Sequence, residues 1–270
     1  MSMLQSRTRS ARKNSRGPGF SPGLSIAPVL LAVALTAVLA SGLWWGLLRG
    51  SSPDPAGTRA SLDFTRIADG PPPTRFDTGQ PASSSKSPQD PGSNFVVRNG
   101  RLTYQPTTNE VSAAYFSTLD MGAPLTSLGA SWVFSPRKGT LGAIALLVSR
   151  GLRDAMPPIT PPVPVHFVAT ALNWTLGVAK DENTPLETIA AGDFTAPLRE
   201  DGATAYAVSI HINGDEVTID LPDGGRTTVM DPRIAEWRGD YATFEVYSNH
   251  GLTDSLGGFE RVWADSTGKH

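Results

Sequence analysis

Residues 205–221 read AYAVSIHINGDEVTIDL, and this stretch decides the fold class. Apolar and polar residues alternate on both sides of a central Asn213-Gly214 pair, so the apolar side chains of each half lie on one face of a strand. An Asn-Gly pair between two such runs is typical of a type I′ turn, in which both residues have positive φ. The stretch therefore predicts an antiparallel β-hairpin.

The same pattern recurs through the chain from residue 61 onward. A second Asn-Gly hairpin is expected at 95–104, FVVRNGRLTY, whereas the Pro- and Ser-rich residues 69–94 favour a loop. The Asp-Pro pair that opens residues 231–237 favours one short helix. About eleven to thirteen short strands separated by turn signals predict an all-β sandwich or barrel. The other expected strands cover residues 113–119, 128–134, 141–148, 165–169, 172–179, 227–230, 241–247 and 259–264.

The composition excludes several classes of protein. The chain has 270 residues, no cysteine and a formal net charge of -2. Disulfides, thiol catalysis and cysteine-based zinc sites are therefore excluded. Residues 1–53 contain no Asp or Glu, so the acidic residues all follow them and the rest of the chain is acidic. An acidic domain argues against nucleic acid as a partner, because phosphate contacts need a basic surface.

An uncharged apolar run, IAPVLLAVALTAVLASGLWWGLL, fills residues 26–48. It is long enough for one membrane-spanning helix, which we place at residues 24–48 in contact with the lipid bilayer. Residues 1–23 are basic and are expected to form a disordered cytoplasmic tail, and residues 49–60 a linker. The positive-inside rule then makes residues 61–266 an extracytoplasmic domain of a single-pass cell-membrane protein. A signal peptide cleaved after Val38-Leu39-Ala40 is the alternative.

The order of these signals resembles the concanavalin A-like lectin/glucanase (LamG-like) jelly roll. The residues that carry the resemblance are the hairpin FVVRNGRLTYQ, the apolar run LGAIALLV, the segment VTIDLPDGG and the closing pair YATFEVYS and GFERVWADS. The resemblance implies a jelly-roll β-sandwich of two antiparallel sheets over residues 61–265, and a protein that faces carbohydrate. Jelly-roll glucanases carry their acids in a pattern like E-x-D-x-x-E, and this chain has no such run.

Sugar-binding sites use aromatic rings that stack on sugars and polar groups that bind hydroxyls. Trp174 and Asn173 form one candidate pair, with His166 one strand earlier. Trp237 and Tyr247 form a second candidate group, and core packing is the alternative for the tryptophans. Trp132 and Trp263 alternate within strands and are expected in the core.

Catalysis and metal binding have weaker candidates. A glycosidase needs two carboxylates about 5–10 Å apart. The nearest pairs are Asp215 with Glu216 at a turn, and Glu245 with Glu260 on the last two strands, and a solvated strand face is the alternative. The acidic turn at 181–183 (Asp-Glu-Asn) is a candidate calcium site, and no other cofactor is expected. The four histidines, His166, His211, His250 and His270, lack the H-x-x-x-H spacing of a metal site.

The sequence therefore predicts a membrane-anchored extracytoplasmic module that binds cell-envelope polysaccharide, or an envelope protein, without catalysis. Two alternatives stay open. One is a glycan hydrolase whose carboxylates come from separate strands. The other is a structural ectodomain that works through protein contacts.

Overall fold

A computed structural model describes residues 57–118, 121–136, 138–151, 165–179 and 186–267. The predicted tail at 1–23, the span at 24–48, most of the linker and the acidic turn at 181–183 lie outside these ranges. Within them, no helix combines the length and the apolar character that crossing a bilayer requires. The first strand begins at Arg59, inside the segment that the sequence assigns to the linker.

The described residues form two antiparallel sheets. The eight-stranded sheet has the order β13-β12-β11-β6-β15-β4-β3, with β1 also pairing β15. It comprises β1 (Arg59–Asp63), β3 (Asn94–Arg98), β4 (Arg101–Gln105), β6 (Leu125–Phe134), β11 (Ala205–Asn213), β12 (Glu216–Asp220), β13 (Arg226–Met230) and β15 (Gly257–Ser266).

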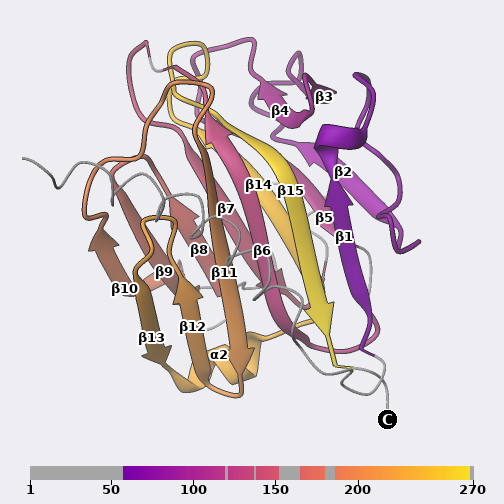
Figure 1. Ribbon diagram of the computed structural model, residues 1–270, viewed down its shortest axis with the longest axis vertical. Coiled ribbons are helices and arrows are strands. Elements are labelled where there is room, and N and C mark those ends of the chain that lie inside the picture. Colours follow the sequence, from indigo (N-terminus) through magenta and orange to yellow (C-terminus); the bar gives the residue numbers. More distant parts are fainter. Residues whose placement is uncertain (1–56, 119–120, 137, 152–164, 180–185, 268–270) are drawn as a thin grey trace, which may run out of the picture. The chain divides into compact units, whose positions relative to one another are not determined.

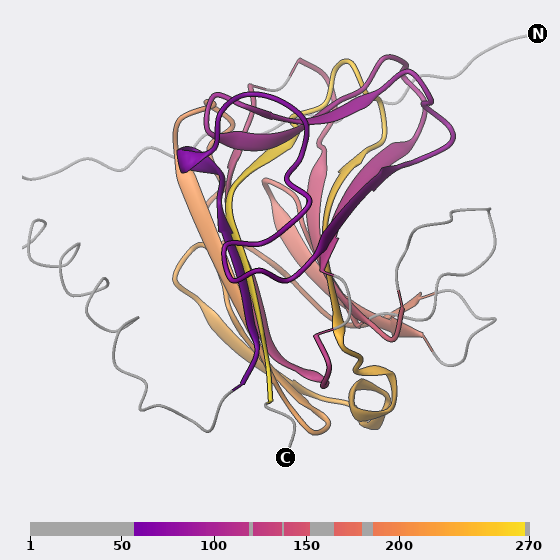
Figure 2. The ribbon, with the colours of Figure 1, turned by 90° about the vertical axis from the view of Figure 1, so that its right-hand side faces the viewer.

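The seven-stranded sheet has the order β10-β9-β8-β7-β14-β5-β2. It comprises β2 (Ala82–Lys86), β5 (Ser112–Thr118), β7 (Ala143–Ser149), β8 (Val165–Ala169), β9 (Asn173–Ala179), β10 (Leu186–Asp193) and β14 (Tyr241–Ser248). Figure 1 looks onto the eight-stranded sheet, and Figure 2 shows the sheets as two layers. The all-β, two-sheet prediction is confirmed, and the arrangement is consistent with a jelly-roll sandwich.

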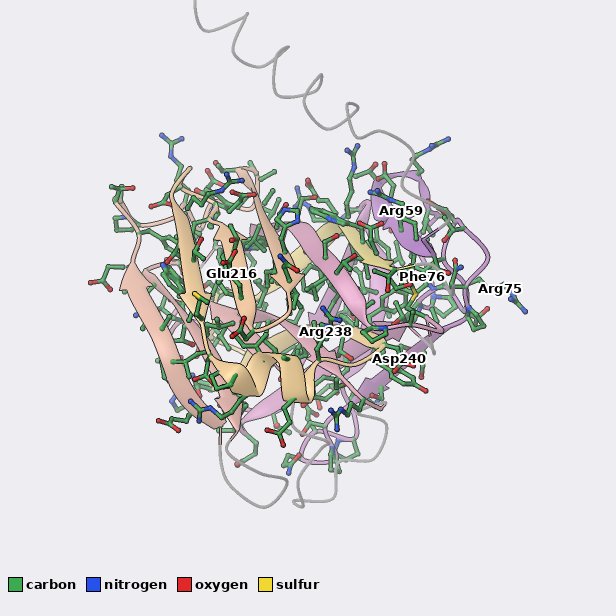
Figure 3. The ribbon with its side chains drawn as sticks, turned by 90° about the horizontal axis from the view of Figure 1, so that it is seen from below. Arg59, Arg75, Phe76, Glu216, Arg238 and Asp240 are labelled. Carbon is green, nitrogen blue, oxygen red and sulfur yellow. The ribbon has the colours of Figure 1, made fainter. Side chains whose placement is uncertain are left out.

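Of the two predicted Asn-Gly hairpins, the one at 95–104 has both turn residues in the left-handed region. In the other, Gly214 (φ 62°) is left-handed, whereas Asn213 is still part of β11 and pairs with Glu216. Asn99 (φ 52°) and Gly100 (φ 72°) make the left-handed turn between β3 and β4. Asp231 caps the predicted helix, α2 (Pro232–Trp237), by accepting a 3.0 Å hydrogen bond from the backbone N–H of Arg233. This helix contacts β12 of one sheet and β9 of the other, so it lies across the end of the sandwich just before Arg238 (Figure 3).

Two strands escape the sequence prediction. Strand β2 has the sequence ASSSK and lies inside the expected loop at 69–94. Its serines carry no apolar alternation, and pairing with β5 holds it in the sheet. Strand β10 at the other edge is largely exposed and is interrupted by a register shift between Thr188 and Ala190. Edge strands pair on one side only, so their side chains give a weak periodic signal.

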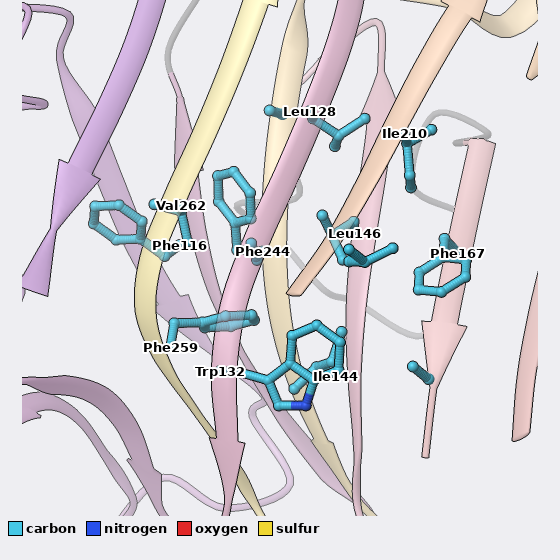
Figure 4. Close-up of a cluster of buried hydrophobic side chains, with 14 of the residues drawn as sticks. Phe116, Leu128, Trp132, Ile144, Leu146, Phe167, Ile210, Phe244, Phe259 and Val262 are labelled. Atoms are coloured by element: carbon cyan, nitrogen blue, oxygen red, sulfur yellow. The ribbon is translucent and has the colours of Figure 1, made fainter. Parts of the chain in front are cut away.

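The core lies between the sheets and is rich in aromatic rings (Figure 4). Phe244 of β14 contacts Phe259 of β15 edge to face, with ring centroids 6.1 Å apart, and joins the two layers. Trp132 is fully buried, as predicted. The same prediction for Trp263 is wrong, because a register shift between Phe259 and Arg261 turns the following residues over. Val262 and Ala264 therefore enter the core, and Trp263 points to the outer face.

The loop between β14 and β15 carries the chain from one sheet to the other, and Asp254 holds it. This buried carboxylate accepts hydrogen bonds from the Ser248 hydroxyl (3.0 Å), the Asn249 N–H (2.7 Å), the His250 N–H (3.0 Å) and the Thr140 hydroxyl. Burial by itself raises the pKa of Asp254, but these hydrogen bonds outweigh burial and lower the pKa below its ordinary value.

The first prediction concerns the contact between the sheets. Replacing Phe244 by Ala should reduce the free energy of unfolding by about 3–5 kcal/mol, because the change leaves a cavity beside Phe259. Urea unfolding of the full chain measures the loss. The control is Val111→Ala, since Val111 is 52% exposed and its truncation should change stability by less than about 0.5 kcal/mol. A loss below about 1 kcal/mol for Phe244→Ala would contradict this packing.

The second prediction concerns pH. A carboxylate whose pKa is lower in the folded than in the unfolded chain stabilises the fold above its unfolded pKa of about 3.9, and this contribution disappears as the pH falls through the folded value. Asp254→Asn should therefore be less stable than the wild type at pH 7, and the difference should shrink steadily below about pH 4. Urea unfolding at several pH values measures both. A difference that is independent of pH would show that the Asp254 charge does not hold the loop.

Candidate functional site

The outer face of the seven-stranded sheet is buried over its central strands. A sandwich strand normally alternates between a core face and a solvated face. Every residue of β5 and β7 is instead buried, including the outward-facing Tyr115 and Leu147, each 2% exposed. In β14, Phe244 belongs to the core, so Glu245 points outward, and it is also buried. We call this face the outer patch, which consists of Tyr115, Ser117, Ala145, Leu147, His166, Thr243, Glu245 and Tyr247.

Strand register brings these residues together from distant parts of the sequence. Glu245 lies between Tyr115 on β5 and Ala145 on β7. One row along, Thr243 lies between Ser117 and Leu147, and its hydroxyl is 2.8 Å from the Ser117 hydroxyl. His166 on β8 pairs with Leu147, which places it diagonally across β7 from Glu245. The outer patch is thus a polar strip along β14 with an aromatic ring on one side and a histidine on the other.

Glu245 and His166 form the chemical centre of the outer patch. The His166 Nε2 atom lies 3.6 Å from the Glu245 Oε2 atom, and the side chains are 16% and 5% exposed. This separation is longer than a hydrogen bond. The buried Nε2 atom has no hydrogen-bond partner among the described residues. A buried polar atom left without a partner is costly, so a ligand hydroxyl that reaches Nε2 would gain a hydrogen bond that the chain leaves open.

Tyr247 closes the outer patch at the end of β14. Its hydroxyl donates a 2.9 Å hydrogen bond to the Asn249 side-chain oxygen. Burial raises the Tyr247 pKa, and the negative charges of Glu245 and Asp254 raise it further. The phenol therefore stays protonated at neutral pH and presents an apolar ring beside the Glu245 carboxylate. The outer patch can accept hydrogen bonds at Glu245, donate or accept them at His166, and contact apolar surface at Tyr247.

Two of the five residues predicted to bind sugar, His166 and Tyr247, lie on the outer patch, His166 beside Glu245 and Tyr247 two residues along β14 from Glu245. Trp174 does not, because it is 6% exposed and stacks on Phe167 inside the core with ring centroids 6.3 Å apart. Core packing, which the sequence also allows for Trp174, is therefore what the structure shows, and the ring does not present a sugar-binding face. The Asn173 side-chain oxygen accepts a 2.9 Å hydrogen bond from the Thr170 hydroxyl and so stabilises a turn. Trp237 ends α2, and its side chain lies outside the described part of the structure.

The candidate carboxylate pairs do not form a site. Glu245 and Glu260 lie on different sheets, so the register in which Glu260 would lie opposite Glu245 does not occur. The Glu260 Oε1 atom lies 3.2 Å from the Arg101 Nε atom, in an ion pair on the eight-stranded sheet. Asp215 is exposed in the β11–β12 turn, and Glu216 begins β12. Neither residue contributes to the outer patch.

The described ranges contain no group of three or more His, Asp or Glu side chains that could hold a metal ion. His211 lies on β11 of the eight-stranded sheet, 3.7 Å from an Asp220 oxygen, and His250 lies in the loop after β14. His270 and the predicted calcium turn at 181–183 fall outside the described residues. Sequence reasoning did not assign Tyr115 to a site. The burial of residues 112–118 on both faces is visible in the structure and not in the sequence. A local pattern also does not specify which strand lies beside Tyr115.

Comparison with known proteins agrees with the geometry at the level of the fold. No protein-family model and no curated protein matches the chain. Among solved structures, the Ca2+-bound exoplasmic/lumenal domain of VIP36 is 10% identical, covers 78% of this chain and 91% of its own, and has a TM-score of 0.52.

The carbohydrate recognition domain of Emp47p is 9% identical, with 81% of this chain and 100% of that chain covered and a TM-score of 0.52. The catalytic domain of an endo-1,3-beta-glucanase (laminarinase) from Thermotoga petrophila RKU-1 is 11% identical, with 77% and 97% covered and a TM-score of 0.50. At such low identity the likeness concerns the fold alone. The described domain has the fold of the concanavalin A-like lectins and glucanases.

Proposed function

We propose that this chain is a non-catalytic glycan-binding module, held at the outer side of a cell membrane by residues 24–48. One observation carries the proposal, the polar and aromatic outer patch on a sheet face that would otherwise be solvated. Glu245 of β14 lies there with its Oε2 atom 3.6 Å from the Nε2 atom of His166 on β8, and Tyr247 follows two residues along β14. Fold alone does not choose between functions, so the argument depends on this site.

The chemistry of the outer patch suits a sugar. A pyranose ring has hydroxyls around its rim and apolar C–H faces. The Tyr247 ring supplies apolar contact, and the Glu245 carboxylate and His166 imidazole supply directed hydrogen bonds. Two solved neighbours support this direction. The Emp47p domain is described as a carbohydrate recognition domain, and the VIP36 domain has been solved with Ca2+ and Man2 bound, at a TM-score of 0.50.

The number of carboxylates favours binding over hydrolysis. Both common glycosidase mechanisms use two carboxyl groups about 5–10 Å apart. Among the described residues, Glu245 is the one carboxylate of the outer patch. Asp254 is close enough to influence Tyr247, but four donors from the chain already surround it. The role of Asp254 is to hold the loop. Because these donors stabilise the ionised carboxylate, Asp254 is a poor candidate for a general acid, which must be protonated to act.

The third prediction tests the outer patch. The full chain in detergent should bind at least one neutral oligosaccharide on a glycan array. Glu245→Gln and His166→Ala should each weaken that binding about ten- to a hundredfold, because a hydrogen bond to a charged or buried group contributes about 1.5–3 kcal/mol. Isothermal titration with the best array ligand measures the change. The matched control is Glu260→Gln, which makes the same substitution on the other sheet.

Two results would contradict the proposed site. Binding that Glu260→Gln weakens as much as Glu245→Gln would move the site to the other sheet. A complete absence of binding on the array would remove glycan as the ligand class. Release of reducing sugar by the wild type, lost in Glu245→Gln, would instead favour the hydrolase alternative.

The fourth prediction concerns the proposed anchor. Trypsin added to intact cells should cut the linker after Arg49 and release the domain into the medium, because the positive charges of residues 1–23 keep the N-terminus in the cytoplasm. Immunoblotting with an antibody to the domain measures release. Permeabilised cells provide the control. A domain that stays protected in intact cells and is cut only after permeabilisation would reverse the proposed orientation.

A further inference from the structure

We propose a second ligand site on the opposite side of the sandwich, where the partly exposed indole of Trp263 forms a stacking platform for an uncharged polysaccharide chain. The proposal adds a separate surface to the proposed glycan-binding function and does not use the outer patch. It begins from the register shift in β15, which turns Trp263 away from the core and onto the outer face of the eight-stranded sheet.

The indole packs against the backbone of the neighbouring strand. Trp263 is opposite Gly129 of β6, and a Cβ atom at Gly129 would clash with the six-membered ring. The ring therefore occupies the space above Gly129 and is half-buried. A ring held in this orientation is a rigid apolar surface that loses little conformational entropy when a ligand stacks on it.

The groups around the ring are uncommitted hydrogen-bonding groups. Ser61 of β1 and Ser209 of β11 share the row of Trp263 and Gly129 across the sheet, and Ser131 lies one row along. Across the described part of the chain, neither the indole N–H nor these three hydroxyls has a hydrogen-bond partner, and none of them is a buried atom. Hydroxyls that surround an aromatic face match the rim and the face of a sugar ring.

The charges beside the platform cancel. The Arg261 Nε atom lies 3.2 Å from an Asp63 oxygen, and the Arg59 Nη1 atom lies 3.5 Å from an Asp265 oxygen. Each guanidinium next to Trp263 is thus matched by a carboxylate, and the surface offers no net charge to a polyanion. This balance complements a neutral glycan rather than a phosphate- or uronate-rich polymer.

A purely structural explanation covers part of these observations. An aromatic ring that packs over a glycine stabilises a sheet, so the Trp263–Gly129 contact alone would exist without any ligand. That explanation requires neither an open indole N–H nor open hydroxyls on both sides of the ring. The experiment therefore includes a variant that leaves the Trp263–Gly129 contact intact.

The test measures binding of the full chain in detergent to particles of cellulose, chitin and β-1,3-glucan, with polygalacturonate as the charged polymer. The wild type should bind at least one uncharged polymer more tightly than polygalacturonate. Trp263→Ala and Ser209→Glu should each weaken that binding at least tenfold. Ser209→Glu adds a charge beside the indole and leaves the contact between Trp263 and Gly129 intact. Leu252→Glu, which adds the same charge at a loop position that is 54% exposed, should bind like the wild type.

Several outcomes would overturn the platform. One is that Ser209→Glu binds the uncharged polymer as tightly as the wild type does. Another is that the wild type binds no uncharged polymer. A third is that the wild type binds polygalacturonate more tightly than every uncharged polymer. A change from dimer to monomer in Ser209→Glu, seen by sedimentation, would assign the face to a second copy of the chain. Glu245→Gln serves as the cross-check. If it loses oligosaccharide binding while polymer binding persists, the two sites are independent. If the outer patch binds nothing, the polymer assay still decides the platform by itself.

Discussion

The contact between Phe244 and Phe259 is the interaction on which the rest of the structure depends. These rings come from β14 and β15, which follow each other in the sequence but belong to opposite sheets. Because both rings point inward, the residue after Phe244 must point outward from the seven-stranded sheet, and that residue is Glu245. The register shift after Phe259 then sends Trp263 outward from the other sheet. One inter-sheet contact thus orients the side chains of both proposed binding surfaces.

The fold class and many element positions could be predicted, because alternation and turn chemistry are local. The Asn99-Gly100 hairpin and α2 occur where the sequence places them. Strand neighbours are not local. Glu245 meets Tyr115 and His166 through pairings that span about a hundred residues, which no periodicity encodes. Trp263 was misplaced for a related reason, since one inserted residue in β15 reverses the faces of all that follow.

Trp174 and Trp263 show in opposite ways what a local pattern does not determine. Trp174 has a polar neighbour, Asn173, as a sugar-binding tryptophan often does, yet its ring packs in the core against Phe167. Trp263 follows the pattern of a core residue, yet it covers Gly129 on the outside. Burial of an aromatic ring is decided by which sheet face its position takes, and composition near the ring does not reveal it. The function that we propose therefore depends on positions that only the assembled sheets define.

The most direct test is hydroxyl-radical footprinting of the full chain with and without a bound neutral oligosaccharide. We expect the ligand to protect His166 and Tyr247 from labelling, because both side chains line the outer patch, and labelling of the exposed Leu252 to stay constant. Protection confined to the eight-stranded sheet or to loop residues, with His166 and Tyr247 labelled as before, would contradict it.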